Sequence, residues 1–184
     1  NLVQLIADGI CNSLSFTKDG AALYSCLTWR TYSDFETALN EMNKEVKACI
    51  VWDKKSIGLG QANYRPQHEF IFYCGGQWYG DKKQSDVWYL SRGNTSEYVH
   101  PTQKPVELIE MALENSSKAG DIVIDCFGGS GSTLVACEKQ ARGARLIELD
   151  EKYVDAIIMR WQNFTGKVAV HAETGKTFKE MKAE

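Results

Sequence analysis

Residues 121–132, Asp-Ile-Val-Ile-Asp-Cys-Phe-Gly-Gly-Ser-Gly-Ser, decide the fold of this 184-residue chain. Their apolar run, 122–124, is bounded by acids and then by glycines, which is typical of a strand buried on both faces of a parallel sheet. The glycines allow a tight turn that approaches a ligand closely, and Ser132 opens a helix. A strand, a glycine turn and a helix N-terminus together predict a nucleotide-type cofactor site.

The turn differs from the dinucleotide fingerprint Gly-x-Gly-x-x-Gly, because Leu134 stands at the third glycine position. A second apolar strand is expected over 144–149, with Glu148 near its carboxyl end. A carboxylate there can accept hydrogen bonds from both hydroxyls of a ribose. The two elements suit an adenosine that carries a small zwitterion. On these residues alone, a structural strand–helix–strand unit with a glycine turn is the alternative.

Length and composition limit the class of protein. With 184 residues, 43% of them hydrophobic, the chain is expected to form one globular domain. No apolar run approaches membrane-spanning length and no signal peptide is recognisable, so a cytoplasmic location is the default. Scattered cysteines and histidines predict neither a disulfide framework nor a metal site. The net charge of −3 argues against coating of nucleic acid by bulk charge but permits a local basic groove.

Besides the helix that Ser132 opens, periodicity along the chain predicts helices over 2–14, 34–42, 106–116 and 153–164. It predicts strands over 21–29, 46–52, 70–74, 122–124, 144–149 and 167–171. Strands 46–52 and 70–74 are joined without a helix, so we expect antiparallel neighbours at a sheet edge. The predicted fold class is α/β, a doubly wound and mostly parallel sheet with an antiparallel edge strand.

A polar segment, 75–99, separates the two halves of this pattern. It interleaves aromatic residues with the basic residues Lys82, Lys83 and Arg92. Such a mixture can hold phosphates and stack bases. An ordinary surface loop anchored by its aromatic residues is the alternative.

Three stretches together resemble one family: His100-Pro-Thr-Gln-Lys-Pro105, Asp125-Cys-Phe-Gly-Gly-Ser-Gly131, and Leu146-Ile-Glu-Leu-Asp150 followed by Tyr153. They resemble S-adenosylmethionine-dependent amino-group DNA methyltransferases of the permuted beta class, in which the catalytic motif precedes the cofactor motifs. Cys126 stands where the family usually has proline. The resemblance implies the class I, Rossmann-like methyltransferase fold.

Two further stretches extend the resemblance over essentially the whole chain. Tyr64-Arg-Pro-Gln-His-Glu69 resembles an element of phage and ParB-linked members, and Arg160-Trp-Gln-Asn-Phe-Thr-Gly166 resembles their helix end. By this resemblance 1–74 is the carboxyl-terminal part of the catalytic half. The insert 75–99 is then the target-recognition segment, 100–172 the cofactor-binding half, and 173–184 a tail.

The resemblance implies S-adenosylmethionine as cofactor and double-stranded DNA as partner, with methylation of adenine N6 favoured over cytosine N4. The implied cofactor-binding residues are Asp125, Phe127, Gly128, Gly129, Ser130, Gly131, Ser132 and Glu148, with Thr102 and Lys104 closing the pocket from the other side. The candidate DNA-binding residues are Arg65, His68, Lys82, Lys83 and Arg92. For Arg65 and His68, a structural charged cluster that includes Glu69 is the alternative. Family members often pair, which suggests a homodimer.

The motif that performs the reaction in this family is missing from these residues. Family members hold the target amine with an Asp-Pro-Pro-Tyr type motif whose ring stacks on a flipped-out base. Prolines occur here only at 66, 101 and 105, so no Pro-Pro pair exists and no catalytic residue is assigned. In the family this motif follows a central strand. Its loss would leave buried peptide groups unpaired, at about 1–3 kcal/mol each, so we expect a fragment of a longer chain.

Two other functions compete with a methyltransferase acting on DNA. A catalytically inactive partner subunit that binds cofactor and nucleic acid is favoured by the missing motif. A small-molecule methyltransferase fits the glycine turn but neither 100–105 nor the basic and aromatic insert.

Overall fold

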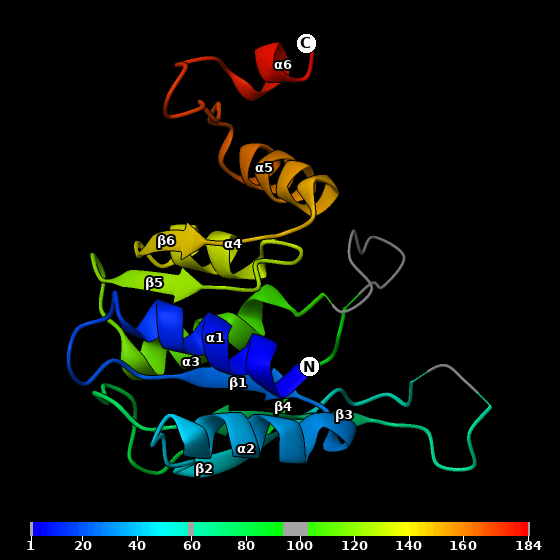
Figure 1. The fold of residues 1–184 in the computed structure, drawn as a ribbon. Coiled ribbons are helices and arrows are strands. Elements are labelled where there is room, and N and C mark those ends of the chain that lie inside the picture. The colour runs from blue at the N-terminus through cyan, green and yellow to red at the C-terminus, as the bar shows by residue number, and fades with distance from the viewer. Residues whose placement is uncertain (1, 59–60, 94–102, 184) are drawn as a thin grey trace. The chain divides into compact units, whose positions relative to one another are not determined.

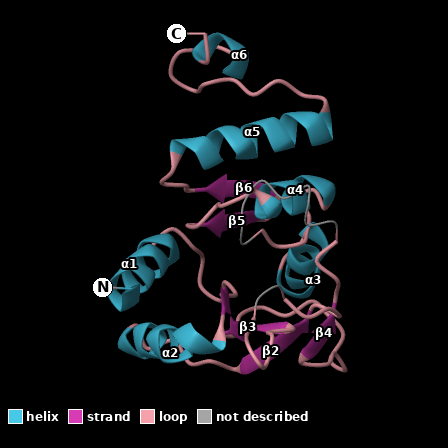
Figure 2. Cartoon of the chain, turned by 90° about the vertical axis from the view of Figure 1, so that its right-hand side faces the viewer, coloured by secondary structure: helices cyan, strands magenta, loops and turns pink. Residues whose placement is uncertain are grey.

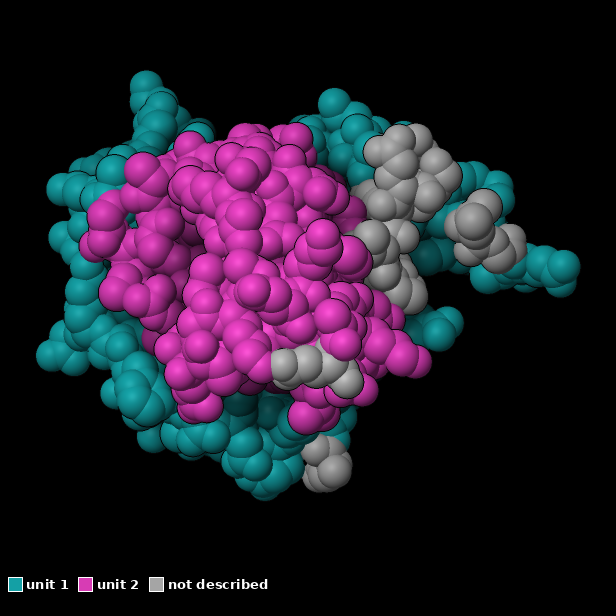
Figure 3. Space-filling view, turned by 90° about the horizontal axis from the view of Figure 1, so that it is seen from above, with its two compact units in different colours: residues 1–93, 110–119 teal, residues 94–109, 120–184 magenta. Residues whose placement is uncertain are grey.

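The structure, a computed structural model, describes residues 2–58, 61–93 and 103–183. The chain divides into two units, which Figure 3 colours separately. Unit 1 comprises residues 1–93 and 110–119, and unit 2 comprises residues 94–109 and 120–184. Each unit has its own sheet. The expectation of a single methyltransferase domain over 1–184 stays a prediction.

The order of the elements follows the predicted pattern closely (Figure 1). Unit 1 holds α1 (Leu2–Leu14), β1 (Tyr24–Leu27), the 3-10 helix η1 (Trp29–Thr31), α2 (Tyr32–Glu41), β2 (Ala48–Asp53), β3 (His68–Tyr73) and β4 (Val87–Tyr89). The helix α3 (Val106–Ser116) begins in unit 2 and ends in unit 1. Unit 2 holds β5 (Ile122–Asp125), α4 (Ser132–Lys139), β6 (Gly143–Leu146), α5 (Glu151–Thr165) and α6 (Phe178–Met181).

The sheet of unit 1 has the strand order β1-β3-β2-β4. Figure 2 labels β3, β2 and β4 of this sheet. β3 is antiparallel to both neighbours, and β4 is parallel to β2, so β1, β2 and β4 point the same way. The predicted antiparallel pairing of 46–52 with 70–74 is confirmed. The predicted edge position is wrong, because β3 lies between β1 and β2 and its Phe72 is fully buried. The unpredicted β4 borders β2, and its three residues suit an edge strand.

The core of unit 1 forms where α1 and α2 pack together and against the sheet. Ile6 and Ile10 share one face of α1, as the helical period requires, and meet Leu39 of α2. Phe72 joins this cluster from β3, and the ring of Tyr32 meets it edge-on at 4.8 Å between centroids. The position of the first helical turn of α2 is therefore fixed by ring packing.

Buried Asn115, near the end of α3, fastens the start of the insert to unit 1. Its carbonyl oxygen accepts a hydrogen bond from the Tyr79 amide at 2.7 Å. Its side-chain amide exchanges two hydrogen bonds with the Gln84 amide, at 2.6 and 2.8 Å. Gly80 passes so close that a Cβ there would lie 2.1 Å from Asn115 Oδ1. Residues 79–84 of the insert are thus joined to α3 at both ends, at Tyr79 and at Gln84.

The sheet of unit 2 consists of β5 and β6, which are parallel, with Asp125 opposite Leu146. The predicted strand over 167–171 is wrong, since this stretch makes only an isolated bridge between Val170 and Thr177. Val170 is 59% exposed, so no packed face is available to support a strand there. The described part of the chain has no helix long and apolar enough to span a membrane.

We expect Gly80→Ala to lower the free energy of unfolding by about 1–3 kcal/mol, because the new methyl group displaces the Asn115 side chain from Gln84. Urea unfolding followed by tryptophan fluorescence measures the change. Gly143→Ala is the control, because a Cβ at Gly143 meets its nearest atom at 3.5 Å. That control should change stability by less than about 1 kcal/mol. Equal losses of stability in both variants would contradict the proposal that the contacts between Asn115 and Gln84 hold the insert in place.

Candidate functional site

The glycine turn joins β5 to α4 as the sequence predicts. Its backbone needs glycine at two positions, since φ is +53° at Gly129 and +74° at Gly131. A Cβ at Gly131 would also come within 3.0 Å of Ile157 on α5. The Gly128 amide donates to the Ile147 carbonyl at 2.9 Å, which ties the turn to the segment after β6. The turn is therefore fixed from two sides.

The carboxylate of Asp125 braces the turn from within. One oxygen accepts a hydrogen bond from the Thr133 hydroxyl at 2.6 Å, and the other accepts from the Phe127 amide at 3.0 Å. These contacts hold the last residue of β5 to the first turn of α4. Asp125 thus shapes the predicted site through its neighbours in the chain.

Glu148 lies two residues beyond β6 and reaches back to the glycine turn. Its Oε2 accepts a hydrogen bond from the Gly129 amide at 2.6 Å. Its Oε1 accepts from the amides of Leu149 and Asp150, at 2.9 and 3.0 Å. The sequence analysis placed the acid and the glycines in one site, and the structure brings them into direct contact.

Arg160 is a residue of this site that the sequence analysis did not assign. From α5, its Nη1 donates to the Ser130 carbonyl at 2.9 Å and lies 3.2 and 3.1 Å from the hydroxyls of Ser130 and Ser132. Both serines are buried. Arg160 stands three residues after Ile157, which packs on the same turn. Residues three apart lie on the same face of a helix, so the spacing from Ile157 is the signal in the sequence that could have identified Arg160.

The segment before α3 also reaches the turn. The Ser132 hydroxyl donates to the Lys104 carbonyl at 2.6 Å, so Lys104 lies beside the start of α4. That Lys104 closes a cofactor pocket stays a prediction. The proposed partner of Lys104, Thr102, lies outside the described residues.

The surroundings of Glu148 fit an adenosine-type group. Phe127, Ile147 and Leu149 are 51%, 62% and 99% exposed, and all three lie within three residues of the end of β5 or β6. Apolar groups at this edge can cover the faces of a base, and the carboxylate can accept hydrogen bonds from hydroxyls. A Cβ at Gly129 would meet the Phe127 carbonyl oxygen at 3.7 Å, an ordinary van der Waals distance. Ligands of open α/β sheets bind at this carboxyl edge.

The structure separates the predicted DNA-binding residues into two groups on unit 1. Exposed Arg65 and His68 lie at the start of β3, where His68 stands opposite Asp53, the last residue of β2. Arg92 follows β4 and lies near Gly58, at the same end. This end of the sheet is the carboxyl end of β1, β2 and β4.

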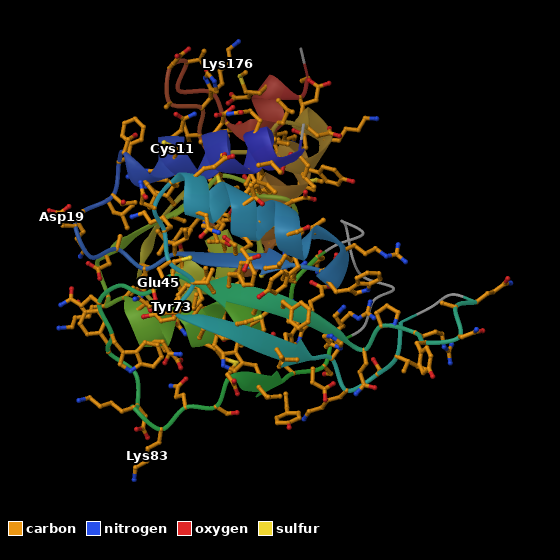
Figure 4. All side chains as sticks on the ribbon, turned by 60° about the horizontal axis from the view of Figure 1, so that its bottom comes forward. Cys11, Asp19, Glu45, Tyr73, Lys83 and Lys176 are labelled. Carbon is orange, nitrogen blue, oxygen red and sulfur yellow. The ribbon has the colours of Figure 1, made fainter. Side chains whose placement is uncertain are left out.

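The other two basic residues, Lys82 and Lys83, lie at the opposite end, between the end of β3 and the start of β4. Figure 4 shows Lys83 extending away from the ribbon at the end where Tyr73 and Glu45 lie. The five residues therefore do not form one continuous surface. Their role in binding DNA stays a prediction.

A buried ion pair fixes the base of the loop between β2 and β3. Lys54 Nζ lies 2.7 Å from Glu69 Oε1, and only 6% of the Lys54 side chain is exposed. Its amide donates to the Gln67 carbonyl at 2.9 Å. The Gln67 side chain donates to Asp53, which is the main cause that lowers the pKa of the Asp53 carboxyl. Glu69 thus has a structural partner that the sequence analysis did not foresee.

Comparisons with known proteins identify the family. The profile of the N6/N4 methyltransferase family of DNA methylases matches residues 11–159, and this chain belongs to that family. The type II methyltransferase M.Cfr9I of Citrobacter freundii is 31% identical over 144 residues, which cover 68% of this chain and 47% of that protein. The chain thus spans about half the length of that relative.

Solved structures match the fold. The M1.HpyAVI–SAM complex matches with a TM-score of 0.72 and 24% identity, over 86% of this chain and 81% of that one. The cytosine-N4-specific PvuII DNA methyltransferase matches with a TM-score of 0.70 and 14% identity, over 84% of this chain and 70% of that one. The mixed sheet of unit 1, the parallel pair of unit 2 and their helices thus match the fold of these solved DNA methyltransferases.

We expect Arg160→Met to lower the free energy of unfolding by about 1.5–3 kcal/mol, because buried acceptors on Ser130 and Ser132 lose a charged donor. Urea unfolding measures the loss. Arg145→Met is the matched control, since Arg145 is exposed on β6, and it should change stability by less than about 0.5 kcal/mol. A control variant that loses as much as Arg160→Met would show that the contacts to the turn do not matter.

Proposed function

We propose that this chain forms the cofactor-binding part of a site-specific DNA methyltransferase that uses S-adenosylmethionine. The contact between Glu148 and Gly129 carries the proposal, since it puts a fixed carboxylate beside a glycine turn at the carboxyl ends of parallel strands. One of the solved structures that match the fold, M1.HpyAVI, is a complex with SAM, which supports S-adenosylmethionine as the cofactor.

Different residues of unit 2 bind different parts of this cofactor. Glu148 binds the ribose hydroxyls, and three backbone amides prevent its carboxylate from turning away. Phe127 and Leu149 supply apolar surface for the adenine. Asp125 and Arg160 hold the turn in the shape that admits the methionine end. When bound, the cofactor supplies a methyl group on a positively charged sulfur.

The reaction is the transfer of that methyl group to an exocyclic amine of DNA, with adenine N6 favoured over cytosine N4. Catalysis of this kind depends on positioning and on stabilisation of developing charge. The Asp-Pro-Pro-Tyr type motif is absent from the 184 residues, and none of them is assigned to hold the amine. Arg65, His68 and Arg92 contact DNA at the carboxyl end of the unit 1 sheet, and Lys82 and Lys83 form a separate basic site.

We expect Glu148→Gln to raise the Kd for S-adenosylmethionine by about 10- to 100-fold, because charge-assisted hydrogen bonds to the ribose contribute about 1.5–3 kcal/mol. Isothermal titration calorimetry measures this Kd. Glu151→Gln, an exposed change in the first turn of α5, is the control and should leave it unchanged.

An unaltered Kd in Glu148→Gln would refute the ribose assignment. The substrate class is tested with S-adenosylmethionine that carries a tritiated methyl group. We expect transfer of the label to duplex DNA and no transfer to small amines. Cofactor binding without transfer to DNA by the intact protein would favour the inactive partner subunit.

A further inference from the structure

One end of the unit 1 sheet gathers residues from four strands. β1, β2 and β4 finish there and β3 begins there, because Leu27 stands opposite Phe70 and Asp53 stands opposite His68. Tyr89, the last residue of β4, stands beside Asp53. The register therefore brings the residues just after β1 to the same edge as His68 and Tyr89.

Large aromatic side chains are exposed along this edge. Trp29 directly after the end of β1 is 66% exposed, and Tyr89 is 64% exposed. Tyr64 is 96% exposed, in the connection from β2 to β3, which extends away from the sheet in Figure 1. By contrast, Trp52 and Trp88 of the same sheet are buried in the core. The exposed rings at this edge thus lie on η1, in a loop and at a strand end, and a group of exposed apolar side chains at one edge is a candidate interaction site.

The backbone turn that carries Trp29 is fixed before any ligand binds. It begins η1, whose ends are joined by hydrogen bonds from the Thr31 amide to the Thr28 carbonyl at 3.1 Å and from the Thr28 amide to the Thr31 hydroxyl at 3.3 Å. Tyr32 follows and packs edge-on against Phe72. A tryptophan on a fixed turn loses little conformational freedom when a ligand covers it.

The charges at this edge favour an anionic partner that also has flat rings. The guanidinium of Arg30 lies 5.4 Å from the centre of the Trp29 ring. Exposed Arg65 and Lys55 add positive charge, whereas Lys54 is buried and neutralised by Glu69. The acids at this edge include Asp53, which accepts hydrogen bonds from the Gln67 side chain and the Lys55 amide, and Asp34 in the first turn of α2. The exposed cations Arg30, Lys55 and Arg65 outnumber these two acids.

We propose that Trp29 is a stacking surface for an unpaired base of DNA and that the neighbouring Arg30 binds the adjoining phosphate. Aromatic rings next to cationic side chains bind single-stranded nucleic acid in this way, since every base offers a flat face. The assignment rests on the proposed function in one respect, that DNA is the partner. It adds two residues of η1 that neither the basic insert nor the 64–69 element includes.

The test compares two ligands, a 15-nucleotide single-stranded DNA of mixed sequence and an abasic strand of the same length. We expect Trp29→Ala to raise the Kd for the base-containing strand about tenfold and to leave the Kd for the abasic strand unchanged, because a stacked base contributes about 1–3 kcal/mol. Trp29→Phe should keep most of the affinity. Arg30→Ala should weaken the binding of both ligands. It should also reduce the slope of log Kd against log salt concentration by about one.

Phe16→Ala is the matched control, because Phe16 is an aromatic residue that is 83% exposed but lies between α1 and the start of β1, at the other end of that strand. It should leave both Kd values unchanged. Equal effects of Trp29→Ala and Phe16→Ala, or an equal loss of both ligands in Trp29→Ala, would overturn the proposal.

The Kd for S-adenosylmethionine, measured on the same variants, separates this inference from the function on which it rests. Normal cofactor and DNA binding with no selective effect at Trp29 overturns the stacking surface alone. A wild-type protein that binds cofactor but neither strand overturns the DNA assignment as well. Loss of the base-containing strand alone, with cofactor affinity intact, supports the stacking surface.

Discussion

The carboxylate of Glu148 is the constraint on which the candidate cofactor site depends. It joins the turn after β5 to the segment after β6, through the Gly129 amide on one side and the Leu149 and Asp150 amides on the other. Hydrogen bonds to an ionised carboxylate are among the strong ones in proteins. Because the glycine turn and the acid fix each other, the distance between them is set before a cofactor binds, and the cost of ordering them falls on folding.

Local sequence signals predicted much of this structure, including α1, α3 and the β5–turn–α4 unit with Glu148 nearby. Each rests on a periodicity or a glycine pattern within a dozen residues. The pairs that escaped prediction are Arg160 with Ser130, Asn115 with Gln84, and Lys54 with Glu69. Their partners lie 30, 31 and 15 residues apart in sequence. No local pattern encodes such contacts, because they depend on which elements pack together.

Strand topology also decides which basic residues can act together. Composition grouped Lys82, Lys83 and Arg92 in one insert, but β4 crosses the sheet between them and carries Arg92 to the opposite end. The same topology brings Arg30, more than thirty residues upstream of Arg65, to the edge where Arg65 lies. The interior position of β3 has a similar origin. A hairpin from β2 can pair on either side, and the inner position buries Phe72 in the cluster formed with α1 and α2.

The three long-range polar pairs share a physical role. A buried polar group is costly unless it is fully hydrogen-bonded, so Lys54, Asn115 and the serines of the turn restrict the backbone to arrangements that satisfy them. Each pair stands at the base of a segment proposed to bind a ligand: Lys54–Glu69 under the β2–β3 loop, Asn115–Gln84 under the insert, and Arg160–Ser130 under the glycine turn. Apolar packing of equal area would tolerate small shifts of these segments. Hydrogen bonds depend on direction, so they fix the segments in position. For that reason we infer that these pairs determine the geometry of the sites more than they stabilise the fold.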